Sequence, residues 1–335
     1  MDDPNKNAEI WYQKAEKKLK SWWGSKSENY QEAAELFEKS ANLYKIAKNM
    51  DKAGEAYIRA SDCLRVESPW EASSMLAAAA NCYKISSPQK ALITYRKASN
   101  YCLEDGKFQQ AAKLITEVAE IYEKESMIMD AIESYREAAG LYRTENATFL
   151  EQKCLLKAAD YMSSKKIGLY SEAITIWENA STISQDNSSL TFRTKEYLFK
   201  AALCRFATGD YVGSARTLKN YEDQNVGFAA SRECQFLAEI LDAMKNYNLD
   251  SFTKAVVEYD SITQLKPWYT EILLTIKKTI ESNPDHTQNE PNQTNNNKDD
   301  NDNEDDNNNN NKDDKDDKDD KDDKENEDDD EDNLT

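Results

Sequence analysis

Residues 91–98 read ALITYRKA and residues 131–138 read AIESYREA. Each stretch has a small residue, a tyrosine four positions later and a second small residue three positions after the tyrosine. The spacing i, i+4, i+7 puts all three side chains on one face of an α-helix. With an aromatic or aliphatic middle residue, the pattern occurs at Ala33/Phe37/Ser40, Ala53/Tyr57/Ala60, Ser73/Ala77/Ala80, Ala91/Tyr95/Ala98, Ala111/Ile115/Val118, Ala131/Tyr135/Ala138 and Ala173/Trp177/Ala180.

The first six copies start about 20 residues apart, which fits one helix and a short turn. Two such helices form a unit of about 40 residues, the scale of tetratricopeptide-like solenoids. Small residues let neighbouring helices approach closely, and stacking buries each apolar face. No proline, which would break a helix interior, lies between Pro88 and Pro267. Residues 1–190 are therefore predicted to form an all-α, tetratricopeptide-like, right-handed solenoid of helical hairpins.

The pattern is less regular in the second half of the chain. We expect helices at about 144–163 and 168–182, and then at 197–207, 212–221, 231–246 and 269–280. Residues 191–281 are predicted to form a C-terminal helical bundle. Residues 282–335 are rich in Asn, Asp and Lys and have almost no apolar side chain to bury. They are predicted to be a disordered acidic tail.

The acidic charge is concentrated at the end of the chain. Residues 281–335 hold 24 acidic residues and six lysines, so they account for −18 of the formal charge of −20. The remaining residues are almost neutral. A surplus of basic residues is typical of proteins that bind nucleic acids. This chain has no such surplus, and therefore no nucleic-acid partner is predicted.

The residues needed for common catalytic centres are missing from the sequence. The one histidine, His286, lies in the tail, which argues against Ser-His-Asp, Cys-His and His-containing zinc centres. The six cysteines form no CxxC pair and have apolar neighbours, so buried free thiols are expected. No catalytic residue, metal or cofactor is predicted, and a binding protein is favoured over an enzyme.

The chain shows no targeting or membrane-spanning segment. Its first residues, MDDPNKNAE, are polar, and no apolar run approaches the roughly 18 residues of a transmembrane helix. A cytoplasmic location is expected.

Several segments between residues 8 and 280 identify a family. They include ANLYKIAKN at 41–49, AEIYE at 119–123, KCLLK at 153–157, KEYLFKAALC at 195–204 and SREC at 231–234. In this order and spacing they resemble the soluble NSF attachment proteins (SNAPs), more closely the alpha/beta type than the gamma type. The resemblance implies a cytoplasmic adaptor, peripherally associated with membranes, that coats assembled SNARE complexes in several copies. It also implies that this adaptor recruits and stimulates the ATPase NSF, which then disassembles the complex.

The resemblance also implies residues for each contact. Two tryptophans in the first interhelical loop, Trp22 and Trp23, match the position of a membrane-touching loop. Acidic residues Asp210 and Asp242 and the penultimate Leu334 are implied for binding or stimulating NSF. The bases implied to bind the acidic SNARE complex are Lys107, Lys113, Lys153, Lys195 and Arg232, with Lys48 and Lys157 as weaker candidates.

The repeat pattern alone also fits a second kind of binding protein. A tetratricopeptide-like scaffold or co-chaperone that binds peptide tails would share the same solenoid. Such a protein would need Asn and Lys side chains arranged as a carboxylate clamp in one groove, and no such arrangement stands out in the sequence.

Overall fold

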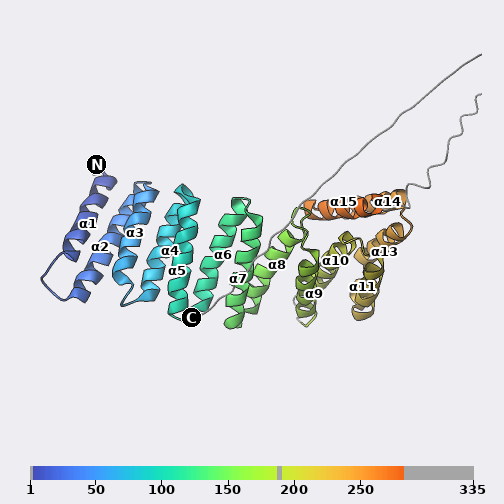
Figure 1. The fold of residues 1–335 in the computed structure, drawn as a ribbon, viewed down its shortest axis with the longest axis horizontal. Helices are drawn as coiled ribbons and strands as arrows, with labels where there is room; N and C mark the ends of the chain where they lie inside the picture. Colours follow the sequence, from blue (N-terminus) through green and yellow to red (C-terminus); the bar gives the residue numbers. More distant parts are fainter. Residues whose placement is uncertain (1–2, 187–190, 283–335) are drawn as a thin grey trace, which may run out of the picture. The chain divides into compact units, whose positions relative to one another are not determined.

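The computed structural model describes residues 3–186 and 191–282, and within these ranges it contains helices and no strand (Figure 1). The all-α prediction is confirmed for this part of the chain. The helices are α1 Pro4–Leu19, α2 Lys26–Ile46, α3 Met50–Leu64, α4 Pro69–Ser86, α5 Pro88–Glu104, α6 Phe108–Lys124, α7 Ile128–Thr144, α8 Thr148–Met162, α9 Tyr170–Asp186, α10 Thr191–Ala207, α11 Tyr211–Gln224, α12 Val226–Ala229, α13 Arg232–Lys245, α14 Leu249–Ile262 and α15 Pro267–Glu281.

Helices α1 to α8 lie side by side in the order of the sequence (Figure 1). Ion pairs join alternate helices, as between Lys84 of α4 and Glu117 of α6 at 2.7 Å. Arg136 of α7 and Glu172 of α9 form an equivalent pair at 2.7 Å. The odd-numbered and even-numbered helices therefore form two layers. The term even layer is used below for α2, α4, α6, α8 and α10.

The repeated small and aromatic residues form the interface between these helices. Apart from half-buried Ala77, every residue of the seven copies is buried. The alanines allow close packing, and hydroxyls of the middle tyrosines reach the preceding helix, as from Tyr95 to Asn81 at 2.7 Å. Gly54 shows how close the approach is, because a Cβ placed there would lie 2.5 Å from Cζ of Tyr83.

One turn geometry recurs at the helix ends. In five turns a residue adopts a positive φ, and the next amide donates to the carbonyl five residues earlier, as from Met127 to Tyr122 at 2.9 Å. This pattern is the Schellman motif, which satisfies carbonyls at a helix end. Only one of the five left-handed residues is a glycine. The five residues are Lys48, Gly106, Ser126, Asn146 and Tyr247.

Each expected helix occurs, but α10 begins at Thr191 rather than at residue 197, and helices α12 and α14 were not expected. A further difference lies at the start of α8. A helix was expected from about residue 144, but Thr144 is the last residue of α7 and α8 begins at Thr148. Asn146, with a φ of 55°, takes the left-handed conformation that ends α7. A turn formed by residues Glu145 to Ala147 separates the two helices. Of these residues only Asn146 is typical of turns, so the sequence gives little sign that α7 ends here.

The C-terminal helices pack around α10. Phe199 of α10 contacts the rings of Phe236, Tyr259 and Tyr269, which come from α13, α14 and α15. The largest core cluster extends from Ala112 to Ile280 and includes α10 and its neighbours on both sides. The division predicted at residue 190 stays a prediction. The predicted tail, including His286 and Leu334, lies outside the described residues.

Candidate interaction sites

The loop between α1 and α2 presents two indole rings to solvent. Trp22 is 85% exposed and Trp23 is 72% exposed, and their ring centroids lie 4.8 Å apart in an edge-to-face arrangement. The two adjacent tryptophans are thus in the first interhelical loop, as the sequence indicated. Neither ring packs into the core. An indole pair of this exposure is a costly feature for a surface that only meets water.

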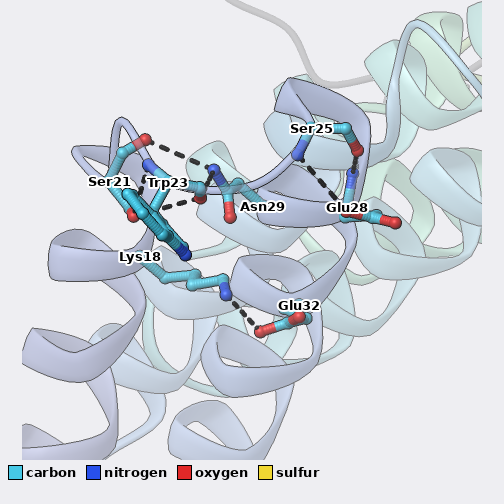
Figure 2. A network of polar contacts seen from close by, with 7 residues as sticks. All are labelled: Lys18, Ser21, Trp23, Ser25, Glu28, Asn29 and Glu32. Carbon is cyan, nitrogen blue, oxygen red and sulfur yellow. Dashed lines mark hydrogen bonds and ion pairs between the residues drawn. The ribbon is translucent and has the colours of Figure 1, made fainter.

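A buried amide fixes this loop. The Asn29 side chain is only 4% exposed, and its Nδ2 donates to the carbonyl oxygens of Ser21 at 3.3 Å and Trp23 at 3.0 Å. The Ser21 hydroxyl donates to the Trp23 carbonyl, and the Trp23 amide donates back to the same hydroxyl oxygen. Figure 2 shows these contacts converging on the loop between the two helices. The loop is therefore held in one conformation from inside.

The start of α2 adds a second constraint. Ser25 and Glu28 form a capping box, in which the Glu28 amide donates to the Ser25 hydroxyl and the Ser25 amide donates to the Glu28 carboxylate (Figure 2). Gly24 precedes the cap with a φ of +91°, a backbone conformation that residues with a side chain rarely adopt. The tryptophans are thus followed by a rigid helix start rather than a free linker.

Most of the bases implied for SNARE binding lie on the even layer. Lys107 is the N-cap residue of α6, Lys113 lies on α6, Lys153 lies on α8 and Lys195 lies on α10. All four are exposed, and none makes an ion pair with another described residue. Their positive charges are therefore available to an incoming partner.

Lys157 differs from these four because it is already paired. Its ammonium lies 3.3 Å from Oε1 of Glu123, and the other oxygen of this carboxylate, Oε2, accepts a hydrogen bond from the Tyr135 hydroxyl at 2.7 Å. Burial raises the pKa of the Glu123 carboxyl, but the hydrogen bonds from Tyr161 and Tyr135 and the charge of Lys157 outweigh it, so the pKa lies below its usual value. Lys48, the other weaker candidate, is exposed at the turn after α2.

A pocket on the even layer brings two of the implied bases together. It has a volume of about 230 Å³ and lies between α8, α9 and α10. Lys153 and Lys157 of α8 lie at its rim with Arg193 of α10, while Lys195 lies two residues further along α10. Lys113 lines a different pocket, between α4 and α6, beside the half-exposed Trp70.

Arg232 lies apart from this group, at the first residue of α13. It donates to the Thr263 hydroxyl at 2.8 Å, and its guanidinium lies 5.3 Å from the centre of the Tyr259 ring. It lines a shallow pocket between α13 and α14 with Glu239 and Glu258. Arg232 is thus more constrained than the lysines, and its pocket has an acidic rim.

The two acidic residues implied for NSF are exposed and lie on different helices. Asp210 is the N-cap of α11 and accepts a hydrogen bond from the Gly213 amide at 2.9 Å. Asp242 lies on α13 and accepts a hydrogen bond from Asn246 at 3.1 Å. Both carboxylates therefore already have local partners, and the structure does not bring them into contact. Leu334 lies outside the described residues.

The sequence reasoning missed two features of these sites. It did not identify Asn29, although Asn29, Ala33 and Phe37 follow the helical spacing of the buried face, and a polar residue there is unusual. It also did not identify the pocket between α8 and α10 or its apolar wall. Exposed Phe149, in the first turn of α8, was a usable signal.

The metal-ligand residues and the cysteines of the described chain are dispersed or buried. The described residues contain no group of three or more His, Cys, Asp and Glu that could hold a metal ion. All six cysteines are free and buried, and burial raises the pKa of the Cys63 thiol to about 11. Across residues 3–186 and 191–282, no helix combines the length and apolarity that crossing a bilayer requires.

The fold and these surfaces define a helical-repeat protein that offers basic, aromatic and apolar surface features for contact with other molecules. A profile of the soluble NSF attachment proteins matches residues 6–281. The chain is 36% identical to the alpha-soluble NSF attachment protein of Mus musculus over 293 residues, covering 84% of this chain and 98% of the mouse protein. It therefore belongs to the soluble NSF attachment protein family.

Two further relatives extend this similarity to plants and fungi. The alpha-soluble NSF attachment protein of Vitis vinifera is 34% identical over 283 residues, which cover 84% of this chain and 97% of the relative. The vesicular-fusion protein SEC17 of Komagataella phaffii is 34% identical over 269 residues, covering 80% of this chain and 91% of the relative. The family predicted from the sequence segments is thus confirmed.

Proposed function

We propose that this protein is an adaptor in vesicle fusion that binds assembled SNARE complexes and recruits and stimulates the ATPase NSF. The match to the soluble NSF attachment proteins over residues 6–281 carries this proposal, and the names of the relatives point to NSF attachment and vesicular fusion. The adaptor needs no catalytic group of its own, since NSF supplies the ATP hydrolysis.

The exposed lysines of the even layer support contact with an acidic partner. Lys107, Lys113, Lys153 and Lys195 make no ion pair with another described residue, so binding does not first have to break one. Complementary charge accelerates encounter and sets the register of a complex, and its effect weakens with salt. We assign Lys157 and Arg232 a smaller part in this contact because they already have partners.

The tryptophan loop supports peripheral contact with a membrane. Indole rings favour the interface between lipid and water, and both rings are exposed on a loop that is fixed from inside. In this proposal Trp22 and Trp23 hold the adaptor at the membrane that carries the SNARE complex.

The residues proposed to bind or stimulate NSF are Asp210, Asp242 and Leu334. Asp210 caps the start of α11 and Asp242 lies on α13, both far in the sequence from the tryptophan loop. Leu334 is the penultimate residue, about 50 residues after α15. Several copies of the adaptor on one SNARE complex would raise the local concentration of this leucine at NSF.

A charge reversal on the even layer tests the SNARE contact. Lys113→Glu combined with Lys153→Glu should weaken binding to a soluble SNARE complex by at least about tenfold at low salt, and less as salt rises. Circular dichroism should show unchanged helicity, because both side chains are exposed. Lys6→Glu with Lys17→Glu on α1 is a control with the same change in charge. Equal effects of the two pairs would remove the even layer from the proposed site.

A second experiment tests the membrane contact. Trp22→Ser with Trp23→Ser should slow NSF-driven disassembly of SNARE complexes anchored in liposomes and leave disassembly of soluble complexes nearly unchanged. If both reactions slow equally, the tryptophans act on something other than the lipid surface.

A further inference from the structure

The pocket between α8, α9 and α10 combines apolar walls with a basic rim. Its walls include Phe149 and Leu156 of α8, Ile183 of α9 and Tyr197 of α10. Its rim carries Lys153, Lys157 and Arg193. The carboxylate in the lining, Asp160, is already paired with Lys200 at 2.7 Å. The free charge around this apolar pocket is therefore positive.

The size of the pocket decides what kind of group fits it. Sites for drug-sized molecules and cofactors usually have volumes of about 300–1,000 Å³. At about 230 Å³ this pocket is smaller, and it suits a single large side chain of a protein partner. Pockets that receive one aliphatic or aromatic side chain are typical of the centres of protein interfaces.

The charges at the rim decide what surrounds that side chain. Another pocket on the even layer, between α2 and α4, has an acidic rim formed by Glu35, Glu38 and Glu71. The two pockets are alike in position between even-numbered helices but opposite in charge. A partner whose apolar side chain is flanked by carboxylates therefore favours the pocket at α8 and α10 over the pocket at α2 and α4.

We infer that the pocket between α8 and α10 receives one apolar side chain from an acidic helix of the SNARE complex, while Lys153 and Arg193 contact the carboxylates beside it. This inference rests on the proposed function. It adds an apolar anchor and a further basic residue, Arg193, to a surface otherwise described by its lysines alone.

Phe149 is the wall residue best suited to test this inference. Its side chain is 73% exposed in the free protein, so its replacement does not disturb the core. An arriving apolar side chain would cover the ring and remove it from water. Truncation of an aromatic residue at such a position commonly weakens binding by about tenfold or more.

The experiment measures binding of the full chain to a soluble SNARE complex at low and high salt. Phe149→Ala should lose about tenfold in affinity, and Phe149→Leu, which keeps an apolar wall, should lose much less. The loss from Phe149→Ala should be the same at both salt concentrations, while the loss from Arg193→Glu should shrink as salt rises. Met129→Ala is a matched control, because Met129 is 55% exposed in a pocket between α7 and α9 of the other layer.

The outcomes separate this inference from the proposed function. Failure of the unmodified chain to bind any SNARE complex would overturn both. Normal binding by the unmodified chain with no effect of Phe149→Ala would overturn the pocket alone. A loss that depends on the concentration of the adaptor itself would assign the pocket to a second copy of this chain and would also overturn the inference. A photoreactive phenylalanine at position 149 should crosslink to an apolar residue that has an acidic residue within one helical turn.

Discussion

Replacing Asn29 by alanine tests whether the tryptophan loop works because it is held in place. The Asn29 amide donates to the carbonyl oxygens of Ser21 and Trp23, on either side of Trp22. Asn29→Ala removes both hydrogen bonds but leaves both tryptophans in the chain. Asn29→Asp is a sharper change, because a carboxylate would face two carbonyl oxygens without a proton to donate.

The structure sets the expected size of the effect. A hydrogen bond of this kind contributes about 0.5–1.5 kcal/mol, so two bonds stabilise the loop conformation by about 1–3 kcal/mol. Since 1.4 kcal/mol corresponds to a factor of ten, membrane partitioning can weaken by about 5- to 150-fold if only the fixed loop binds lipid. Asn29 itself is buried, but the loop residues around its acceptors are exposed, so water can replace part of each lost bond after Asn29→Ala. The lower end of the range is therefore expected for this variant.

Vesicle flotation with indole fluorescence measures the partitioning, and amide hydrogen exchange of the loop measures its order without lipid. Both should change for Asn29→Ala and change more for Asn29→Asp. Gln31→Ala is the control, because Gln31 is an exposed amide side chain on the same helix. The reasoning is refuted if loop exchange accelerates while partitioning stays at the level of the unmodified protein.

Further changes test the packing, the ionisation and the tail. Gly54→Ala should destabilise the protein by about 1–3 kcal/mol in urea unfolding, because the added Cβ meets the buried Tyr83 ring; an unchanged midpoint would contradict the close approach. Burial raises the pKa values of Tyr57 and Tyr83 to about 12, so the folded state resists their ionisation. Stability should therefore be complete below about pH 10 and fall as pH rises toward 12, which thermal unfolding across this range can check. Leu334→Ala should reduce stimulation of NSF ATPase activity without changing SNARE binding, whereas Leu334→Met should retain it; full stimulation by the alanine variant would end the role proposed for Leu334.

The repeated helices were predictable because each copy of the pattern of small and aromatic residues indicates by itself which helical face is buried. Ala91, Tyr95 and Ala98 indicate a buried helical face without reference to the rest of the chain, and the structure buries all three. The turns were harder to predict. Gly106 marks its turn, but Ser126 and Tyr247 adopt the same left-handed conformation with side chains that rarely favour it. At these positions the neighbouring helices determine the turn, so local sequence carries little signal.

The interaction surfaces were predictable only in part, because they depend on which helices become neighbours. The exposure of Trp22 and Trp23 followed from their place between two helices. The pairing of Lys157 with Glu123 joins residues of α6 and α8 and could not be read from either segment. The same applies to Lys200, whose ammonium lies between Asp160, Trp177 and Trp268 from three other helices.

The order in which helices meet has a consequence for synthesis of the chain. Helices α1 to α8 pack mainly on helices that precede or follow them directly, so each can dock soon after it leaves the ribosome. The last helix is different, because the Trp268 indole donates to the carbonyl of Asp160, 108 residues earlier. Translation must reach α15 before this contact can form. Until then the side of α10 that packs against α15, including the Phe199 ring that contacts Tyr269, stays uncovered by that helix.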